Sequence, residues 1–267
     1  MVIDTRRTFH ERLVGTRDDI VRLAALVCET IPRGTQALLD GDLEAAQALV
    51  DDDDVLDRLS VDIEERCYTL LTLQQPMGAD MRALITAVRL TSELERSGDL
   101  MVNVAKGARR IYGQPIHPRV RGLIESMSQE ALHLFRVAID AYVDGDAATA
   151  ASLREMDDTL DGLHRTYIAK VLETCRAGEL DIQVAVQLAL VGRFYERVGD
   201  HAVNVGERVL YMVTGGMPEH LAPGGQHARA RPADRPLLGI DGADGSSPAP
   251  SSPARDDDTA TTAEAGS

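Results

Sequence analysis

The sequence predicts an all-α protein made of two pseudo-symmetric antiparallel three-helix bundles, followed by a disordered C-terminal tail. Through residues 1–213 apolar residues recur three and four apart, as they do on one face of a helix, and strand-like alternation appears nowhere at length. Hydrophobic residues make up 44% of the 267 residues, aromatic residues only 3%, and Trp is absent, which favours an aliphatic helical core. A sequence repeat then divides the helices into two sets.

Turn and capping signals divide the folded part into six expected helices. A kink is expected near Pro32 and Gly34. Asp42 and Asp146 each follow an Asp-Gly break and are expected N-caps. Pro76 stands at or near a helix start, and residues 113–118 form a turn between the halves. Such long helices joined by short turns must lie antiparallel. The expected helices span about 4–39, 42–74, 77–111, 118–143, 146–177 and 181–213.

The repeat is visible in three pairs of segments. "LERSGDLMVNVA" and "YERVGDHAVNVG" share the frame E-R-x-G-D-x-x-V-N-V at an offset of 101 residues. "DGDLEAA" matches "DGDAATA", and "DDVLDRL" matches "DDTLDGL", both at an offset of 104. We therefore expect a first repeat at 1–112 and a second repeat at 113–214.

Residues 215–267 differ in kind. They hold seven of the eleven Pro and eight of the 22 Gly, with few bulky apolar residues, so they cannot bury enough surface to offset the entropy of ordering. We expect a disordered acidic Pro/Gly/Ser-rich tail. It either has no function or contains a segment that binds a partner or is phosphorylated.

Charge and composition exclude several classes of protein. The formal net charge is −15, which argues against nucleic-acid binding, because phosphate contacts need a basic face. No signal peptide or membrane-spanning run is apparent, so any membrane connection is expected through partner proteins. Cys28, Cys67 and Cys175 are odd in number and far apart, which favours reduced, buried thiols and a cytoplasmic setting.

The repeated frame places acids in a line along one helix face. Glu95 and Asp99 are four residues apart, and Glu196 and Asp200 have the same spacing. Asn103 and Asn204 follow four residues later, so that each line gains an amide oxygen. Carboxylates at i and i+4 repel each other, more strongly where solvent is scarce. Because the carboxylate pair occurs in both repeats despite this repulsion, we expect a cation that compensates its negative charge, either a basic side chain or a metal ion.

The preceding helix of each repeat carries a second pair of acids at the same spacing. An antiparallel hairpin folds these acids against the first line, so each repeat offers two facing carboxylate pairs. Such oxygen donors suit Mg²⁺, Mn²⁺ or iron and can bridge several metals. The candidate metal ligands are Glu95, Asp99, Asp53 and Asp57 in the first repeat, and Glu196, Asp200, Asp157 and Asp161 in the second.

Other interpretations of these residues stay open. Arg96 and Arg197 could neutralise the acids of a metal-free scaffold by ion pairing. Gly98 and Gly199 weaken their helices, and close approach of a neighbouring helix is one reason to keep them. His164 is either a further ligand or a histidine at the surface or at the edge of the core; its counterpart in the first repeat is Ser60.

A carboxylate-bridged di-metal enzyme of the helical-bundle type is the alternative function. Such enzymes need two Glu-x-x-His pairs on different helices. This chain has one, Glu130 and His133. No nucleophile motif or phosphate-binding loop is present either.

The sequence resembles the PhoU family of phosphate-transport system accessory proteins. The motifs that carry the resemblance are "QQPMGADMR", "LERSGDLMVNVA", "YERVGDHAVNVG" and the D-x-x-L-D segments before them, and it covers about residues 4–213. It implies a negative regulator of phosphate uptake and the phosphate-starvation response, not an enzyme. Such proteins link the ATPase subunit of the Pst phosphate transporter to a phosphate-sensing histidine kinase.

The resemblance also bears on metals and assembly. Some members bind multinuclear metal clusters through paired E(D)-x-x-x-D motifs, so Fe, Zn, Mn or Mg are the candidate cofactors here. Dimers are common in the family, and a homodimer is therefore expected. Many members carry an acid where this chain has Ser60. The first cluster therefore has fewer candidate ligands, and Glu64 is a reserve ligand.

Overall fold

The structure, a computed structural model, describes residues 2–216 and their side chains from Arg6 onward. The predicted all-α fold is confirmed, because these residues form six helices and no strand occurs among them. The helices are α1 (Val2–Asp40), α2 (Leu43–Gln74), α3 (Ala79–Arg110), α4 (Pro118–Asp144), α5 (Ala147–Arg176) and α6 (Ile182–Thr214). Beyond Gly216 the expected disordered tail lies outside the described residues.

The capping predictions are confirmed. The Asp42 carboxylate accepts hydrogen bonds from the backbone N–H groups of Glu44 and Ala45, and Asp146 caps α5 in the same way. Asp181 caps α6 in the same way, without the Asp-Gly break that precedes Asp42 and Asp146. The helix α1 continues through Pro32, so this proline does not end it.

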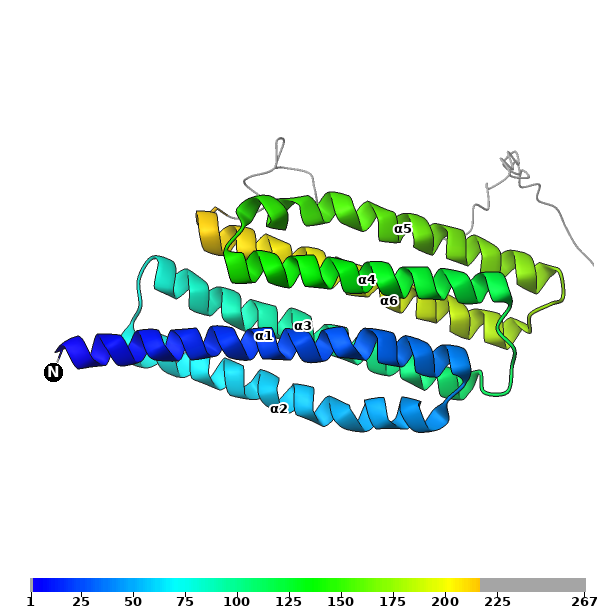
Figure 1. The fold of residues 1–267 in the computed structure, drawn as a ribbon, viewed down its shortest axis with the longest axis horizontal. Coiled ribbons are helices and arrows are strands. Elements are labelled where there is room, and N and C mark those ends of the chain that lie inside the picture. The colour runs from blue at the N-terminus through cyan, green and yellow to red at the C-terminus, as the bar shows by residue number, and fades with distance from the viewer. Residues whose placement is uncertain (1, 217–267) are drawn as a thin grey trace, which may run out of the picture. The chain divides into compact units, whose positions relative to one another are not determined.

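Two sets of three helices lie side by side in Figure 1: α1, α2 and α3 below, and α4, α5 and α6 above. Within each set every helix contacts a neighbour, and the sets meet where α3 packs on α6 and α1 packs on α4. All six helices belong to one compact unit. The long contact between α3 and α6 therefore decides how the candidate ligands of the two repeats are related.

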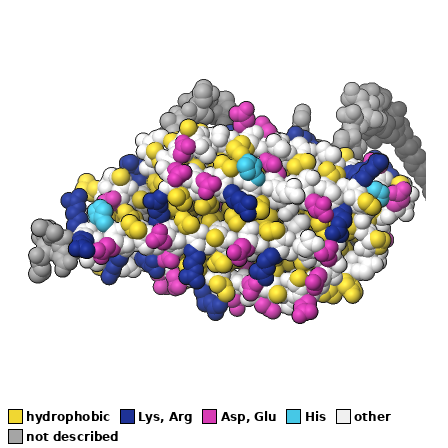
Figure 2. Space-filling model, in the orientation of Figure 1, with side chains coloured by type: hydrophobic (Ala, Val, Ile, Leu, Met, Phe, Trp, Pro, Cys, Tyr) yellow, Lys and Arg dark blue, Asp and Glu magenta, His cyan; other side chains and the backbone are white. Residues whose placement is uncertain are grey.

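The core is aliphatic, as the composition predicts. Ile20, Leu23, Leu84 and Val205 are fully buried, and the larger buried side chains include the ring of Phe135. The face seen in Figure 2 mixes acidic and basic side chains with hydrophobic ones and shows no single basic patch. In the described part of the chain, no helix is long and apolar enough to cross a membrane.

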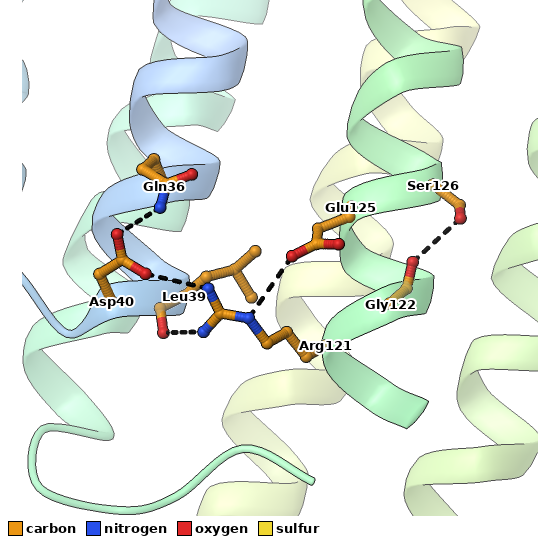
Figure 3. A network of polar contacts seen from close by, with 7 residues as sticks. All are labelled: Gln36, Leu39, Asp40, Arg121, Gly122, Glu125 and Ser126. Atoms are coloured by element: carbon orange, nitrogen blue, oxygen red, sulfur yellow. Dashed lines mark hydrogen bonds and ion pairs between the residues drawn. The ribbon is translucent and has the colours of Figure 1, made fainter. Parts of the chain in front are cut away.

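A polar network joins the repeats at one end of the molecule (Figure 3). The Arg121 guanidinium, near the start of α4, donates to the carbonyl oxygen of Leu39 at 2.5 Å and to the Asp40 carboxylate at 2.9 Å. Glu125 lies 3.4 Å from the same guanidinium. A positive charge at the carboxyl end of α1 complements the helix dipole, so the network fixes α4 against α1.

Candidate metal centres

The first carboxylate cluster lies between α2 and α3. Asp53 and Asp57 belong to α2, and Glu95 and Asp99 to α3. Burial, followed by the charges of Asp57 and Asp99, raises the pKa of Asp53 to about 6. Burial, then Asp99 and Asp57, also raises the pKa of Glu95. The structure thus brings the predicted pairs close enough for each to act on the other.

The second cluster repeats this arrangement between α5 and α6. Burial, then the charges of Asp161 and Asp200, raises the pKa of Asp157 to about 7. Burial, then Asp200, raises the pKa of Glu196 to about 7 as well. Carboxylates crowded in this way hold protons near neutral pH unless a cation compensates their charge.

The glycines of the repeated frame explain how the acidic helices approach one another. A Cβ atom on Gly199 would collide with the Asp157 carboxylate and lie 2.6 Å from Leu160 Cδ2. On Gly98 it would lie 3.3 Å from Leu56 Cδ1 and 3.9 Å from Asp53 Oδ1. Both glycines face the acids of the adjacent helix, and the approach is closer in the second repeat.

The second cluster also holds buried polar atoms without a partner. Oε1 of Glu196 pairs with Arg193, but Oε2 is buried and accepts no hydrogen bond. The Nε2 atom of His164, on α5, is buried and unpartnered too. Burial, then the charges of Arg193 and Arg165, lowers the pKa of His164, which favours the neutral, metal-binding form of the ring.

The basic partners differ in part from those expected. Arg96 and Arg197 are exposed, and neither forms an ion pair with any residue that the structure describes, although the charge of Arg96 opposes the rise in the pKa of Glu95. In the second repeat Arg193, three residues before Glu196, takes that role. In the first, the charge of Lys106 opposes the rise in the pKa of Asp53 and of Asp99. The i, i+3 spacing of Arg193 and Glu196 was the available sequence signal.

Asn204 does not extend the acidic line, contrary to expectation. Its side-chain amide donates at 3.0 Å to the Glu93 carboxylate on α3, and His201 Nδ1 lies 2.6 Å from the same oxygen. Burial raises the pKa of Glu93, but these hydrogen bonds outweigh it and hold the pKa below its ordinary value. The sequence does not single out Glu93 and His201, because their positions have no polar counterparts in the repeat.

The second cluster offers more donors to a cation than the first. It has carboxylate oxygens, one of them buried without a partner, and the buried imidazole of His164 lies one helical turn from Asp161. Yet, within residues 6–216, no three His, Cys, Asp or Glu side chains already stand in a metal-binding arrangement. Ligand assignment to the eight carboxylates therefore stays a prediction.

The fold and the paired acidic clusters define a helical-bundle protein of two repeats. The family model described as PhoU domain matches residues 20–108 and again 124–209. The chain belongs to the PhoU family.

Relatives and solved structures agree with this assignment. The chain is 35% identical to phosphate-specific transport system accessory protein PhoU homolog 1 of Mycobacterium tuberculosis, over 80% of this chain and 96% of that protein. It is also 35% identical to homolog 2 of the same species, over 80% of this chain and 100% of the relative. The crystal structure of PhoU from Pseudomonas aeruginosa superposes with a TM-score of 0.74 at 27% identity, covering 78% of this chain and 100% of that one.

Proposed function

We propose that this protein is a regulatory accessory protein of a phosphate transport system. The observation that carries the proposal is the match of both repeats to the PhoU domain, together with relatives named as accessory proteins of phosphate-specific transport. It acts as a negative regulator of phosphate uptake and of the phosphate-starvation response, and its output is binding rather than catalysis.

Its partners are the ATPase subunit of the Pst transporter and a phosphate-sensing histidine kinase. An acidic adaptor of this kind works in the cytoplasm and reaches the membrane only through them, and a homodimer is its expected assembly. The net charge of −15 favours basic surfaces on those partners. The alternative, a di-metal enzyme, has less support, because His133 of the single Glu-x-x-His pair is exposed on α4.

The carboxylate clusters bind divalent or iron cations, which stabilise the helical hairpins. Bound positive charge would oppose the burial and the crowding that raise the pKa of Asp157 and Glu196, and would give Glu196 Oε2 a partner. When bound, the cation supplies charge neutralisation and cross-links α5 to α6. Asp157, Asp161, Glu196 and Asp200 would hold it there, and Asp53, Asp57, Glu95 and Asp99 in the first repeat.

A deletion strain tests the regulatory role. Cells without this chain should express phosphate-uptake genes in high phosphate, and the intact chain supplied in trans should restore repression. A complementing chain with Tyr68→Phe, a change at an exposed site, serves as the control. If repression in high phosphate is unchanged in a strain that also lacks any paralogue, the proposal is wrong.

Elemental analysis tests the cation clusters separately. Protein purified without a metal-affinity tag should contain metal, and Asp99→Ala/Asp200→Ala should contain less. Equal metal content in the two proteins would contradict the ligand assignment while leaving the regulatory role intact.

A further inference from the structure

The helical turn that carries Glu196 and Asp200 is bonded to the first repeat on both sides. Tyr195 precedes Glu196, and His201 follows Asp200, so about 9 Å of α6 separates these two residues. Both side chains point away from the acidic cluster and into the contact with the first repeat, where each makes a buried polar contact.

The first contact is a group of three hydroxyls. The Tyr195 Oη atom lies 2.6 Å from Thr35 Oγ1 of α1, and Thr35 Oγ1 lies 2.7 Å from Ser128 Oγ of α4. Tyr195 is fully buried, and Thr35 and Ser128 are nearly so. Because buried hydroxyls are costly to leave unpaired, this group fixes the position of α6 against α1.

The second contact is the Glu93 carboxylate of α3, which His201 and Asn204 of α6 both approach within hydrogen-bond distance. Glu93 is 9% exposed and His201 is 6% exposed, so water cannot easily replace either partner. Hydrogen bonds to a buried charge are stronger than neutral ones. The contact therefore fixes the position of α6 against α3.

The repeat symmetry shows that neither contact has a symmetry-related copy. At the offset of 101 residues, Glu93 corresponds to Phe194 and His201 to Leu100, so the related pair is apolar. Tyr195 corresponds in the same way to Leu94, which is fully buried in the core. The first repeat thus meets the second with polar contacts on both sides of Glu196 and Asp200, whereas, among the side chains of residues 6–216, the turn of α3 with Glu95 and Asp99 meets the second repeat through the Glu93 contact.

We propose that Thr35 and Glu93 of the first repeat are positioning residues for the second carboxylate cluster, so that its cation affinity depends on the contact between the repeats. This inference rests on the cation binding proposed above and adds its regulation. A partner that shifts the repeats would change cation affinity at the second cluster and leave the first little affected. Conversely, a cation bound there would stiffen the contact between the repeats.

The test uses the full chain and MnCl₂ in isothermal titration calorimetry. Asp53→Asn/Asp99→Asn removes the first cluster, so that the second is measured alone. In that background, Tyr195→Phe/Glu93→Phe/His201→Leu replaces the polar contacts and gives positions 93 and 201 the residues of their symmetry-related pair. We expect Mn²⁺ to bind at least about tenfold more weakly, a change that reflects less preorganised ligands.

Two matched variants separate positioning from general weakening. Thr86→Val removes another bond between α3 and α6, from the Thr86 hydroxyl to the Arg208 carbonyl oxygen at 3.4 Å, and should leave Mn²⁺ affinity unchanged. Glu93→Gln keeps an acceptor for Asn204 and should retain most of the affinity. In an Asp157→Asn/Asp200→Asn background, where only the first cluster remains, the three substitutions should change affinity less than about twofold.

Hydrogen exchange provides a readout without metal. Amides of residues 195–201 should exchange faster in the three-substitution variant than in the Thr86→Val control. Equal Mn²⁺ affinity with and without the polar contacts, or unchanged exchange at those amides, overturns the inference alone. If the unsubstituted chain binds no Mn²⁺, the cluster assignment fails, and the inference fails with it.

Discussion

Tyr195 shows how a single buried hydroxyl can hold two repeats together. Its ring fills the core while its hydroxyl reaches Thr35, and burial raises the pKa of the phenol far above its ordinary range. The position lies beside Glu196 in sequence, but its side chain serves the contact between repeats. Neighbouring residues on one helix thus have separate tasks because they point to different sides of it.

Removing that hydroxyl should destabilise the protein measurably. Tyr195→Phe leaves Thr35 without its phenol partner and should lower the free energy of unfolding by about 1–2 kcal/mol. Urea unfolding followed by circular dichroism measures the change. Tyr68→Phe, at a tyrosine 52% exposed, is the matched control and should stay within about 0.5 kcal/mol. Equal stability of the two variants would contradict the role given to the Tyr195 hydroxyl.

The crowded carboxylates should make the metal-free protein less stable as the pH rises. Asp157 and Glu196 have folded-state pKa values of about 7, whereas the unfolded values are about 4. Between these limits the folded state binds more protons, so the stability contributed by these groups is complete below about pH 4 and lost above about pH 7. His164, whose pKa is lowered, acts in the opposite direction.

Comparison with a neutralised variant isolates this effect. With EDTA present, the free energy of unfolding should fall from pH 5 to pH 8, and it should fall less in Asp157→Asn/Glu196→Gln. Adding MnCl₂ at pH 8 should raise the unfolding midpoint of the unsubstituted chain more than that of the variant, in which only the first cluster is intact. A pH dependence that is the same in both proteins would show that these two groups do not titrate as assigned.

At the scale of helices, α5 and α6 pack more closely than α2 and α3. A Cβ atom on Gly206 would lie 2.8 Å from the Ala150 backbone oxygen and 2.5 Å from Leu153 Cδ1. The corresponding residue of the first repeat is Ala105, which is fully buried and accommodates its methyl group. The repeated E-R-x-G-D-x-x-V-N-V frame therefore occurs at a closer helix contact in the second repeat, between α5 and α6, than in the first, between α2 and α3.

An alanine pair measures this difference. Gly206→Ala must displace backbone and should destabilise the protein by about 1–3 kcal/mol. Gly98→Ala comes closest to the flexible end of Leu56 and meets Asp53 Oδ1 at an ordinary contact distance of 3.9 Å, and the better helix propensity of alanine offsets the contact, so its effect should stay within about 1 kcal/mol. Chemical denaturation of both variants at one pH is sufficient. If Gly98→Ala lowers the free energy of unfolding more than Gly206→Ala does, then α5 and α6 do not pack more closely than α2 and α3.

The helices and their caps can be predicted because their signals are local. Three- and four-residue spacing, together with the caps Asp42 and Asp146, predicts the elements and their order. The repeat predicts which helices carry facing acids. The contact of Glu93 with His201 cannot be predicted, since the residues are 108 apart in sequence and the repeat holds no second copy of the pair. Periodicity places Asn204 on the acidic line, but only packing shows that it points to Glu93.

At the scale of the whole molecule, the six described helices together form a continuous hydrophobic core. Among residues 6–216, the buried hydrophobic side chains extend from Phe9 to Val209. The two Mycobacterium tuberculosis relatives are shorter than this chain. Each alignment covers 80% of this chain but 96% or 100% of the relative. The family model accordingly matches segments that lie within the described helices, residues 20–108 and 124–209.

A chain that ends at Gly216 should keep the stability of the full chain. No buried hydrophobic residue of the described helices is removed, so the free energy of unfolding should change by less than about 1 kcal/mol, a shift of no more than about 2–4 °C in Tm. Differential scanning calorimetry of the two chains, at equal concentration and without metal, measures it. A chain that ends at Asn204 is the control: it loses Val205 and Val209 from the core and should fail to unfold cooperatively. If truncation at Gly216 lowers Tm as much as truncation at Asn204, residues 217–267 contribute to the fold itself.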